Sequence, residues 1–250
     1  MYRELLDYNI FSGNKDQLMD EILKMPRVNI ISGNPEVLYN GLNNSILKES
    51  YNDKDTIIIP DGIGTIIASK IYGESIKERI PGIEVMDMLM DYCDKNEKSI
   101  YLLGSKSNVI DKCRENIKKI HPKLNILGCK DGFFDIESCD ALIKDIKFLK
   151  PFALFIAMGT PKQEIFIEKY KNSLPCSIFM GVGGSFDVLA GVSKRAPRWV
   201  INMGLEWFYR VSKEPKRIKR LKSIPKFIYL SWKRKKTLWK YCLSLVTLHL

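Results

Sequence analysis

The chain has 250 residues, 45% of them hydrophobic and 28% charged, which suits one large domain, or one domain with an appendage, that is soluble when folded. It contains no apolar run of about 18–20 residues and no basic start followed by an apolar run, so we expect neither a membrane-spanning helix nor a signal peptide. The net charge of +11 comes from positions 194–240, where sixteen Lys or Arg residues face two acids, and such a block needs an anionic partner: nucleic acid, phospholipid or a phosphorylated substrate.

Short apolar, β-branched runs alternate with helical patterns up to about position 190. Strands are predicted at 28–32, 56–60, 99–104, 124–128, 152–157 and 177–182. Helices are predicted at 35–49, 62–72, 84–95, 106–120, 137–149, 162–171 and 185–190. The almost wholly apolar strands are typical of a parallel sheet that is buried on both faces. We therefore predict an α/β fold over residues 1–193, with a Rossmann-like, doubly wound, mainly parallel sheet that binds ligands beyond the carboxyl ends of its strands.

The strand pattern stops after Gly191. Aromatic residues are interleaved with Lys and Arg from there on, and the pattern predicts two or three helices interrupted near Pro215 and Pro225. We therefore predict a basic, aromatic helical appendage over residues 194–250. Tryptophan and tyrosine favour the headgroup region and basic residues are attracted to anionic lipid, so we expect this appendage to bind an anionic membrane surface. A merely solvated basic face is the alternative.

The side chains that commonly bind metals are poorly placed for a metal site. The six cysteines have no CxxC or zinc spacing, which is typical of reduced thiols in a cytoplasmic protein. The two histidines, His121 and His249, have no ligand partner at a useful spacing. The only Asp-x-Asp pair, Asp53 and Asp55, precedes a strand and is predicted to be a solvated turn. We predict no metal and no cofactor.

Two motifs follow the first two predicted strands. In SGNPE (32–36), Asn34 is suited to cap a helix that has Pro35 at its first position, and a ligand-binding role for Asn34 is the alternative. In PDGIG (60–64), Asp61 stands at the carboxyl end of a strand, where catalytic groups gather in this architecture. It is suited equally to accept a proton or to cap the next helix.

Two more motifs follow the last two predicted strands. In GTPKQE (159–164), Thr160 and Gln163 match a capping box with Pro161 at the first helical position, although their polar groups would face the same crevice. In GVGGSFDVLAG (181–191), Gly183 and Gly184 allow backbone N–H groups to approach a diphosphate. The segment is neither a dinucleotide fingerprint, which would need glycine in place of Phe186, nor a P-loop.

Taken in order along the chain, these motifs resemble the WecG/TagA/CpsF family, which is glycosyltransferase family 26. The resemblance runs from NPE at 34–36 to EPKRIKRL at 214–221. Its most specific part is GVGGSFDVLAGVSKRAPRW at 181–199, followed by LEWFYR at 205–210. Each motif alone is weak evidence, whereas the ordered set is strong.

The resemblance implies the reaction and its partners. A sugar, N-acetylmannosamine-type or related, would pass with inversion from a UDP-sugar donor to a polyprenyl-diphosphate-linked acceptor, undecaprenyl in these enzymes, on the inner face of the plasma membrane. The product would serve cell-wall, teichoic-acid or surface-polysaccharide biosynthesis. Transfer of another hexose, such as glucose or ManNAcA, is the alternative.

The resemblance also implies roles for individual residues. Asp61 would be the catalytic base. The predicted substrate-binding residues are Ser32, Asn34, Arg79, Gln163, Gly183, Gly184 and Arg195. The residues predicted to bind the lipid diphosphate are Arg210, Arg217 and Arg220.

Two other protein classes fit parts of the sequence. A nucleic-acid-binding protein would use the basic and aromatic C-terminal part, but it leaves the crevice motifs without a role, so we expect no nucleic-acid partner. A dinucleotide-dependent oxidoreductase would share the fold class but lacks the glycine fingerprint. The sequence leaves self-association as a homo-oligomer open.

Overall fold

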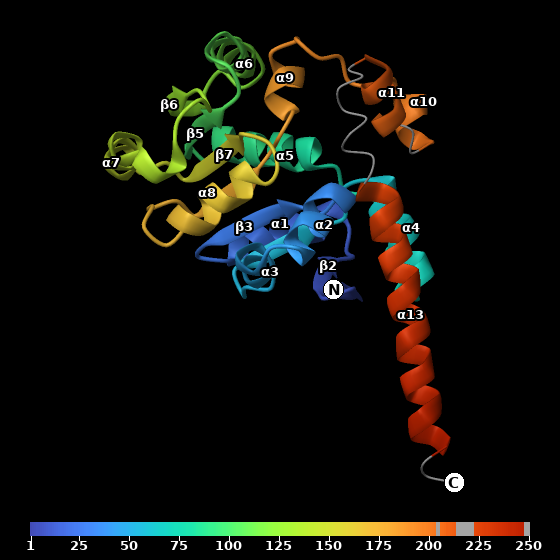
Figure 1. Cartoon of the computed structure of the whole chain (residues 1–250). Helices are drawn as coiled ribbons and strands as arrows, with labels where there is room; N and C mark the ends of the chain where they lie inside the picture. The colour runs from blue at the N-terminus through green and yellow to red at the C-terminus, as the bar shows by residue number, and fades with distance from the viewer. Residues whose placement is uncertain (204–205, 214–222, 248–250) are drawn as a thin grey trace.

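A computed structural model describes residues 1–203, 206–213 and 223–247. Its centre is an eight-stranded sheet with the strand order β1-β2-β4-β3-β8-β7-β5-β6 (Figure 1). The first pair, β1 (Tyr2–Leu5) and β2 (Tyr8–Phe11), is antiparallel, and every other pair is parallel. The predicted mainly parallel α/β fold is therefore confirmed.

All six predicted strands are present. They are β3 (Val28–Ser32), β4 (Thr56–Ile59), β5 (Ser99–Gly104), β6 (Asn125–Lys130), β7 (Ala153–Ala157) and β8 (Ile178–Gly181). The side chains of β3, β4, β7 and β8 are almost all buried, as expected for strands covered on both faces. The hairpin of β1 and β2 was not predicted.

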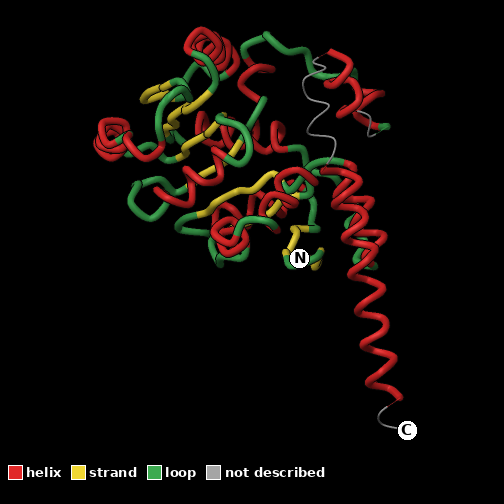
Figure 2. The backbone as a smooth tube through the Cα atoms, viewed as in Figure 1, coloured by secondary structure: helices red, strands yellow, loops and turns green. Residues whose placement is uncertain are grey.

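Helices cover both faces of the sheet (Figure 2). They are α1 (Lys15–Lys24), α2 (Pro35–Leu42), α3 (Ser45–Tyr51), α4 (Ile63–Tyr72), α5 (Gly82–Lys95), α6 (Ser107–Ile120), α7 (Asp140–Leu149), α8 (Lys162–Tyr170) and α9 (Ser185–Leu189), with a 3₁₀ turn at Ile136–Ser138. One core cluster joins the sheet to α1, α5, α6 and α9, and two clusters on the other face join it to α2–α4 and to α7 and α8.

Two details of the helix prediction are wrong. The single helix expected at 35–49 is two helices, because Asn43 ends α2 and the side chain of Asn44 caps α3 by accepting from the Leu47 amide at 3.2 Å. Helix α1 was not predicted, although Asn14 and Gln17 form a capping box at its start.

The C-terminal helices are α10 (Arg198–Asn202), α11 (Glu206–Lys213) and α13 (Ser223–Thr247). Pro225 lies in the first turn of α13, where its missing N–H costs no helical hydrogen bond, and the helix begins two residues before it, near the interruption predicted there. Pro215 lies outside the described residues. No helix in the described part of the chain is long and apolar enough to cross a membrane.

The first turns of α13 are anchored to the body. Phe227 is fully buried in the cluster that α2 and α4 form, and Arg234 forms an ion pair with Asp7 in the β1–β2 hairpin. The rest of α13 extends beyond the body (Figure 1). The sheet and the start of α13 therefore share a core.

The Asp-x-Asp pair has a structural role that was not predicted. Lys171, of which only 2% is exposed, lies 2.5 Å from a carboxylate oxygen of Asp53 and 3.8 Å from one of Asp55, and it also pairs with Glu168 at 3.0 Å. The predicted solvated turn is therefore wrong in part, because it binds the end of α8 through a buried lysine.

Candidate active site

A cavity of about 380 Å³ lies at the carboxyl ends of β3, β4, β7 and β8, and we call it the Asp61 pocket. Its lining includes Ser32, residues 34–37, 61–64, Arg79, residues 81–83, Gly159, Thr160, Gln163 and residues 181–185. Ile67 of α4, together with Glu206, Val211, Ser223 and Ile224 from α11 and α13, completes it. The pocket is where ligands bind in doubly wound folds.

The turns after β3 and β4 lie against each other. Asn34 caps α2 by accepting from the amides of Glu36 at 3.0 Å and Val37 at 3.1 Å, so the predicted capping role is confirmed. Thr65 of α4 donates to the carbonyl oxygen of Gly33 at 2.7 Å, which fixes the position of one turn relative to the other. Because Asn34 also lines the pocket, its amide nitrogen remains a candidate substrate ligand.

Asp61 stands two residues before the start of α4, next to the N-cap residue. The capping residue of α4 is Gly62, whose φ of 100° suits glycine, so Asp61 does not cap this helix through the N-cap position. A methyl group added to Gly82 would overlap Ser32 Oγ and lie 3.5 Å from Asp61 Oδ2, so the first turn of α5 approaches both side chains. Ser32 and Asp61 therefore share one corner of the pocket.

Gln163 contacts the two glycine turns. Its Oε1 accepts from the Gly159 amide at 3.2 Å and from the Gly183 amide at 3.1 Å, and its Nε2 donates to Glu164 Oε1 at 2.8 Å. The predicted capping box with Thr160 is wrong, because α8 begins one residue later and has Pro161 at its N-cap. Burial raises the pKa of Glu164, which is 4% exposed.

The C-terminal helices reach the pocket through an ion pair. Arg79 Nη2 lies 3.5 Å from Glu206 Oε2 at the start of α11, and the two side chains are 16% and 14% exposed. Such a partly buried pair is weakly screened by salt. Arg79 thus presents its remaining guanidinium donors in a pocket wall that α11 helps to build.

A second cavity of about 490 Å³ lies beside the first, at the carboxyl ends of β5 and β7, and we call it the second pocket. Gly159, Gly183 and Gly184 line both pockets and form the wall between them. Lys106 and Asp187 also line the second pocket, and Asp187 accepts a hydrogen bond from Ser105 at 3.3 Å.

Seven of the predicted site residues line the Asp61 pocket: Asp61, Ser32, Asn34, Arg79, Gln163, Gly183 and Gly184. Arg195 is not among its lining residues; it pairs with Glu84 of α5, which also binds Lys15 at 2.7 Å. Burial opposes ionisation of Glu84, but the bonds from Lys15 and Arg195 outweigh it and lower the pKa. The side chain of Arg210 and all of Arg217 and Arg220 lie outside the described residues.

The sequence did not single out two acids of this site. Glu206 contacts Arg79 from 127 positions away, and nothing local in the sequence indicates that contact. Glu164 ends the GTPKQE motif, and burial of its charge could only be inferred once the sheet was known.

Comparison with known proteins decides the family. The sequence pattern of the "Glycosyl transferase WecG/TagA/CpsF family" matches residues 3–241. The chain belongs to the WecG/TagA/CpsF glycosyltransferase family. It is thus a glycosyltransferase, as predicted.

Three bacterial relatives carry the same name, N-acetylglucosaminyldiphosphoundecaprenol N-acetyl-beta-D-mannosaminyltransferase. The protein from Bacillus subtilis (strain 168) is 36% identical over 206 residues, which are 81% of this chain and 78% of that protein. The protein from Bacillus spizizenii is 35% identical, covering 80% of this chain and 76% of its own length. The protein from Staphylococcus aureus (strain MW2) is 35% identical, covering 84% and 82%. These relatives therefore match over most of both chains.

Proposed function

We propose that this glycosyltransferase inverts the anomeric centre of an N-acetylmannosamine-type sugar as it moves it from a UDP donor to an undecaprenyl-diphosphate-linked sugar, for a cell-wall or surface polysaccharide. The observation that carries the proposal is the position of Asp61, whose carboxylate lines a pocket between the sheet and the C-terminal helices. The names of the relatives support the sugar and the acceptor, which would be N-acetylglucosamine-diphosphoundecaprenol.

Asp61 acts as the general base. Its carboxylate takes the proton of an acceptor hydroxyl while that oxygen forms a bond to the anomeric carbon. The bond from this carbon to the β-phosphate oxygen breaks, and UDP leaves with the electron pair from the opposite face. Proton transfer to a positioned base of this kind contributes about 10²–10⁴-fold to the rate.

The donor spans the two pockets. Its sugar must lie near Asp61, and the second pocket adjoins across the wall of Gly159, Gly183 and Gly184, so UDP fits there with its diphosphate at the wall. Glycine lets backbone approach a diphosphate closely. The exposed amine of Lys106 lines the second pocket and has the charge that a diphosphate requires.

The acceptor diphosphate enters from the side of the C-terminal helices. Arg79 lines that side, and α11, which carries Arg210, contributes Glu206 and Val211 to the same wall. Arginine donates two parallel hydrogen bonds to a phosphate. Arg210, together with Arg217 and Arg220 further along the chain, is proposed to bind the lipid diphosphate.

Charge on the departing UDP is stabilised by arginine and backbone N–H groups without a metal. Metal-dependent sugar transferases often use an Asp-x-Asp pair, and the pair in this chain, Asp53 and Asp55, binds Lys171 instead. It also precedes β4, at the end of the strand away from Asp61.

A transfer assay tests the function. With a short-chain N-acetylglucosaminyl-diphosphoprenol acceptor, we expect UDP release from UDP-ManNAc and a disaccharide product of inverted configuration, unchanged by EDTA. UDP-ManNAcA and UDP-glucose are the comparison donors, and a reaction without the acceptor is the control. Faster turnover with either comparison donor would replace the proposed sugar, and no acceptor-dependent release with any donor would reject the transfer.

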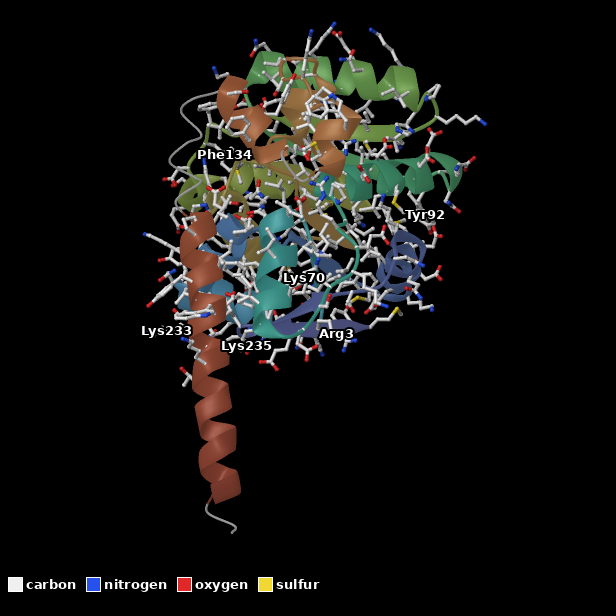
Figure 3. The ribbon with its side chains drawn as sticks, turned by 90° about the vertical axis from the view of Figure 1, so that its right-hand side faces the viewer. Arg3, Lys70, Tyr92, Phe134, Lys233 and Lys235 are labelled. Atoms are coloured by element: carbon white, nitrogen blue, oxygen red, sulfur yellow. The ribbon has the colours of Figure 1, made fainter. Side chains whose placement is uncertain are left out.

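We also propose that the protein binds peripherally to the cytoplasmic face of an anionic membrane. Figure 3 shows Lys233 and Lys235 on α13, with Lys70 and Arg3 on the neighbouring α4 and β1. All four side chains are exposed. They supply a basic surface at the base of the helix that extends from the body.

Reversing two of these charges is expected to weaken vesicle binding at least tenfold. Each lysine near an anionic surface contributes about 1 kcal/mol, so Lys233→Glu with Lys235→Glu removes this attraction and adds repulsion. The measurement is sedimentation with phosphatidylglycerol vesicles at fixed salt. Lys144→Glu with Lys147→Glu on α7 changes the net charge equally at two other exposed positions and is the matched control. Equal binding by both double variants would remove α13 as the docking surface.

A further inference from the structure

The wall between the two pockets is held by one side chain. Gly159 follows β7 and Gly183 follows β8, and both donate their amide N–H to the same oxygen, Gln163 Oε1. The two turns come from neighbouring parallel strands, and Gln163 lies on α8 between them in sequence. Gln163 therefore sets how the turn after β7 and the turn after β8 sit relative to each other.

Glu164 decides which way the Gln163 amide faces. Its Oε1 accepts from Gln163 Nε2 at 2.8 Å and from Thr160 Oγ1 at 3.1 Å. Because this oxygen accepts, the NH₂ end of Gln163 must face it, which leaves the carbonyl end for the glycine amides. A methyl group added to Gly181 would lie 2.6 Å from Gln163 Nε2, so the backbone at the end of β8 packs closely against the NH₂ end of this amide.

Glu164 is an unfavourable residue for packing alone. It is 4% exposed, and its Oε2 is buried without a hydrogen-bond partner among the described residues. A buried polar atom that lacks a partner costs about 1–3 kcal/mol. The nearby side chains of α8 that face the core, Phe166 and Ile167, are apolar. The acid at this position therefore lowers the stability of the fold, and packing alone does not explain why an acid is present there.

We propose that Glu164 is a positioning residue of the transfer reaction, which acts through Gln163 to fix the glycine wall between the two pockets. The inference rests on the proposed function, in which the donor diphosphate crosses that wall. Loss of the Glu164 acceptor lets the Gln163 amide rotate, which shifts the wall and moves the anomeric carbon relative to Asp61. A misplacement of about 1 Å is enough to slow an enzyme about 10²-fold.

Two variants of Glu164 separate its hydrogen bond from its charge. Glu164→Gln keeps an oxygen that accepts from Gln163 and removes the buried acid, so we expect kcat within about threefold of the wild type and an unchanged or higher Tm. Glu164→Met keeps the length of the side chain but has no comparable acceptor. We expect its kcat to fall about 30–100-fold, and the KM for the UDP-sugar to change less than kcat.

A double-mutant cycle tests whether Glu164 works through Gln163. If it does, Gln163→Ala with Glu164→Met lowers kcat no further than Gln163→Ala alone. Glu168→Met is the matched control, since it removes an acid from the next turn of α8 that binds Lys171, away from both pockets. We expect this control to lower the Tm and leave kcat unchanged.

Backbone amide exchange supplies a readout that does not depend on turnover. In Glu164→Met, the Gly159 and Gly183 amide protons should exchange at least tenfold faster with solvent than in the wild type. Unchanged exchange, a kcat for Glu164→Met within threefold of the wild type, or losses that multiply in the double variant would each overturn the inference. If the wild type transfers no sugar, the proposed function fails, and the exchange rates still decide whether Glu164 fixes the wall.

Discussion

Asp61→Asn is expected to lower the turnover number about 10³-fold with little change in Tm or in UDP affinity. The substitution keeps the shape of the side chain and its position beside Ser32 and Gly82, but an amide does not accept the proton of the attacking hydroxyl. The substitution should lower kcat and leave substrate affinity unchanged, because the proton is transferred in the transition state and not when the substrates bind. Turnover is followed by UDP release at saturating donor and acceptor.

Asp135→Asn is the matched control for this substitution. Asp135 is exposed, caps the 3₁₀ turn before α7 by accepting from the Glu137 amide at 3.0 Å, and lines neither pocket. Asparagine caps equally well, so turnover should be unchanged. Near-full turnover of Asp61→Asn would leave the base to be sought elsewhere in the pocket and would remove the central assignment.

The fold was predictable wherever burial on both faces made a strand wholly apolar. The strand at 152–157 satisfies this condition and was placed within one residue. The strand at 28–32 is apolar except for Asn29 and Ser32, and it has the bounds that were predicted. The β1–β2 hairpin was missed because its strands have four residues each and mix polar with apolar side chains. A pattern of four residues carries little information about secondary structure. The position of the hairpin in the sheet depends on the parallel contact of Ile10 in β2 with β4.

The site was predictable to the extent that parallel strands end at one edge of a sheet. Polar residues directly after strands, such as Asn34 and Asp61, were brought together by this rule. Arg195 follows no strand, and tertiary contacts with Glu84 determine its position. Glu206 belongs to a helix that reaches the pocket from the far end of the chain, so its role could not be read from neighbouring residues.

Gln163 illustrates a different limit. The sequence matches a capping box, and the local preference for that arrangement is real. The glycine amides at 159 and 183 offer the Gln163 oxygen two donors instead of the one that a capping box would use. The capping box predicted from sequence is therefore replaced by hydrogen bonds from the two glycine turns to Gln163, and these turns form the wall between the pockets.

Arg79→Ala is expected to lower kcat/KM for the acceptor about 10²–10³-fold, because truncating one partner of a largely buried, hydrogen-bonded charge pair costs about 2–5 kcal/mol. Arg79 is largely buried in the wall that faces α11, and a diphosphate bound there would engage the guanidinium donors more strongly than Glu206 does at 3.5 Å. Arg79→Lys should recover only part of the loss, because lysine keeps the charge without the planar fork. The measurement is kcat/KM for the acceptor at saturating donor.

The ion pair with Glu206 provides the control that distinguishes binding from support. If Arg79 served only to hold α11 against the pocket, Glu206→Gln would cost as much as Arg79→Ala, and the double variant would cost no more than either. If Arg79 binds the diphosphate, the fold-loss in kcat/KM for Glu206→Gln is at most about a tenth of the fold-loss for Arg79→Ala. The substitution weakens the contact between Glu206 and Arg79 and leaves the guanidinium in place. Equal losses would therefore assign Arg79 to the attachment of the C-terminal helices and leave the phosphate charge to the arginines that follow.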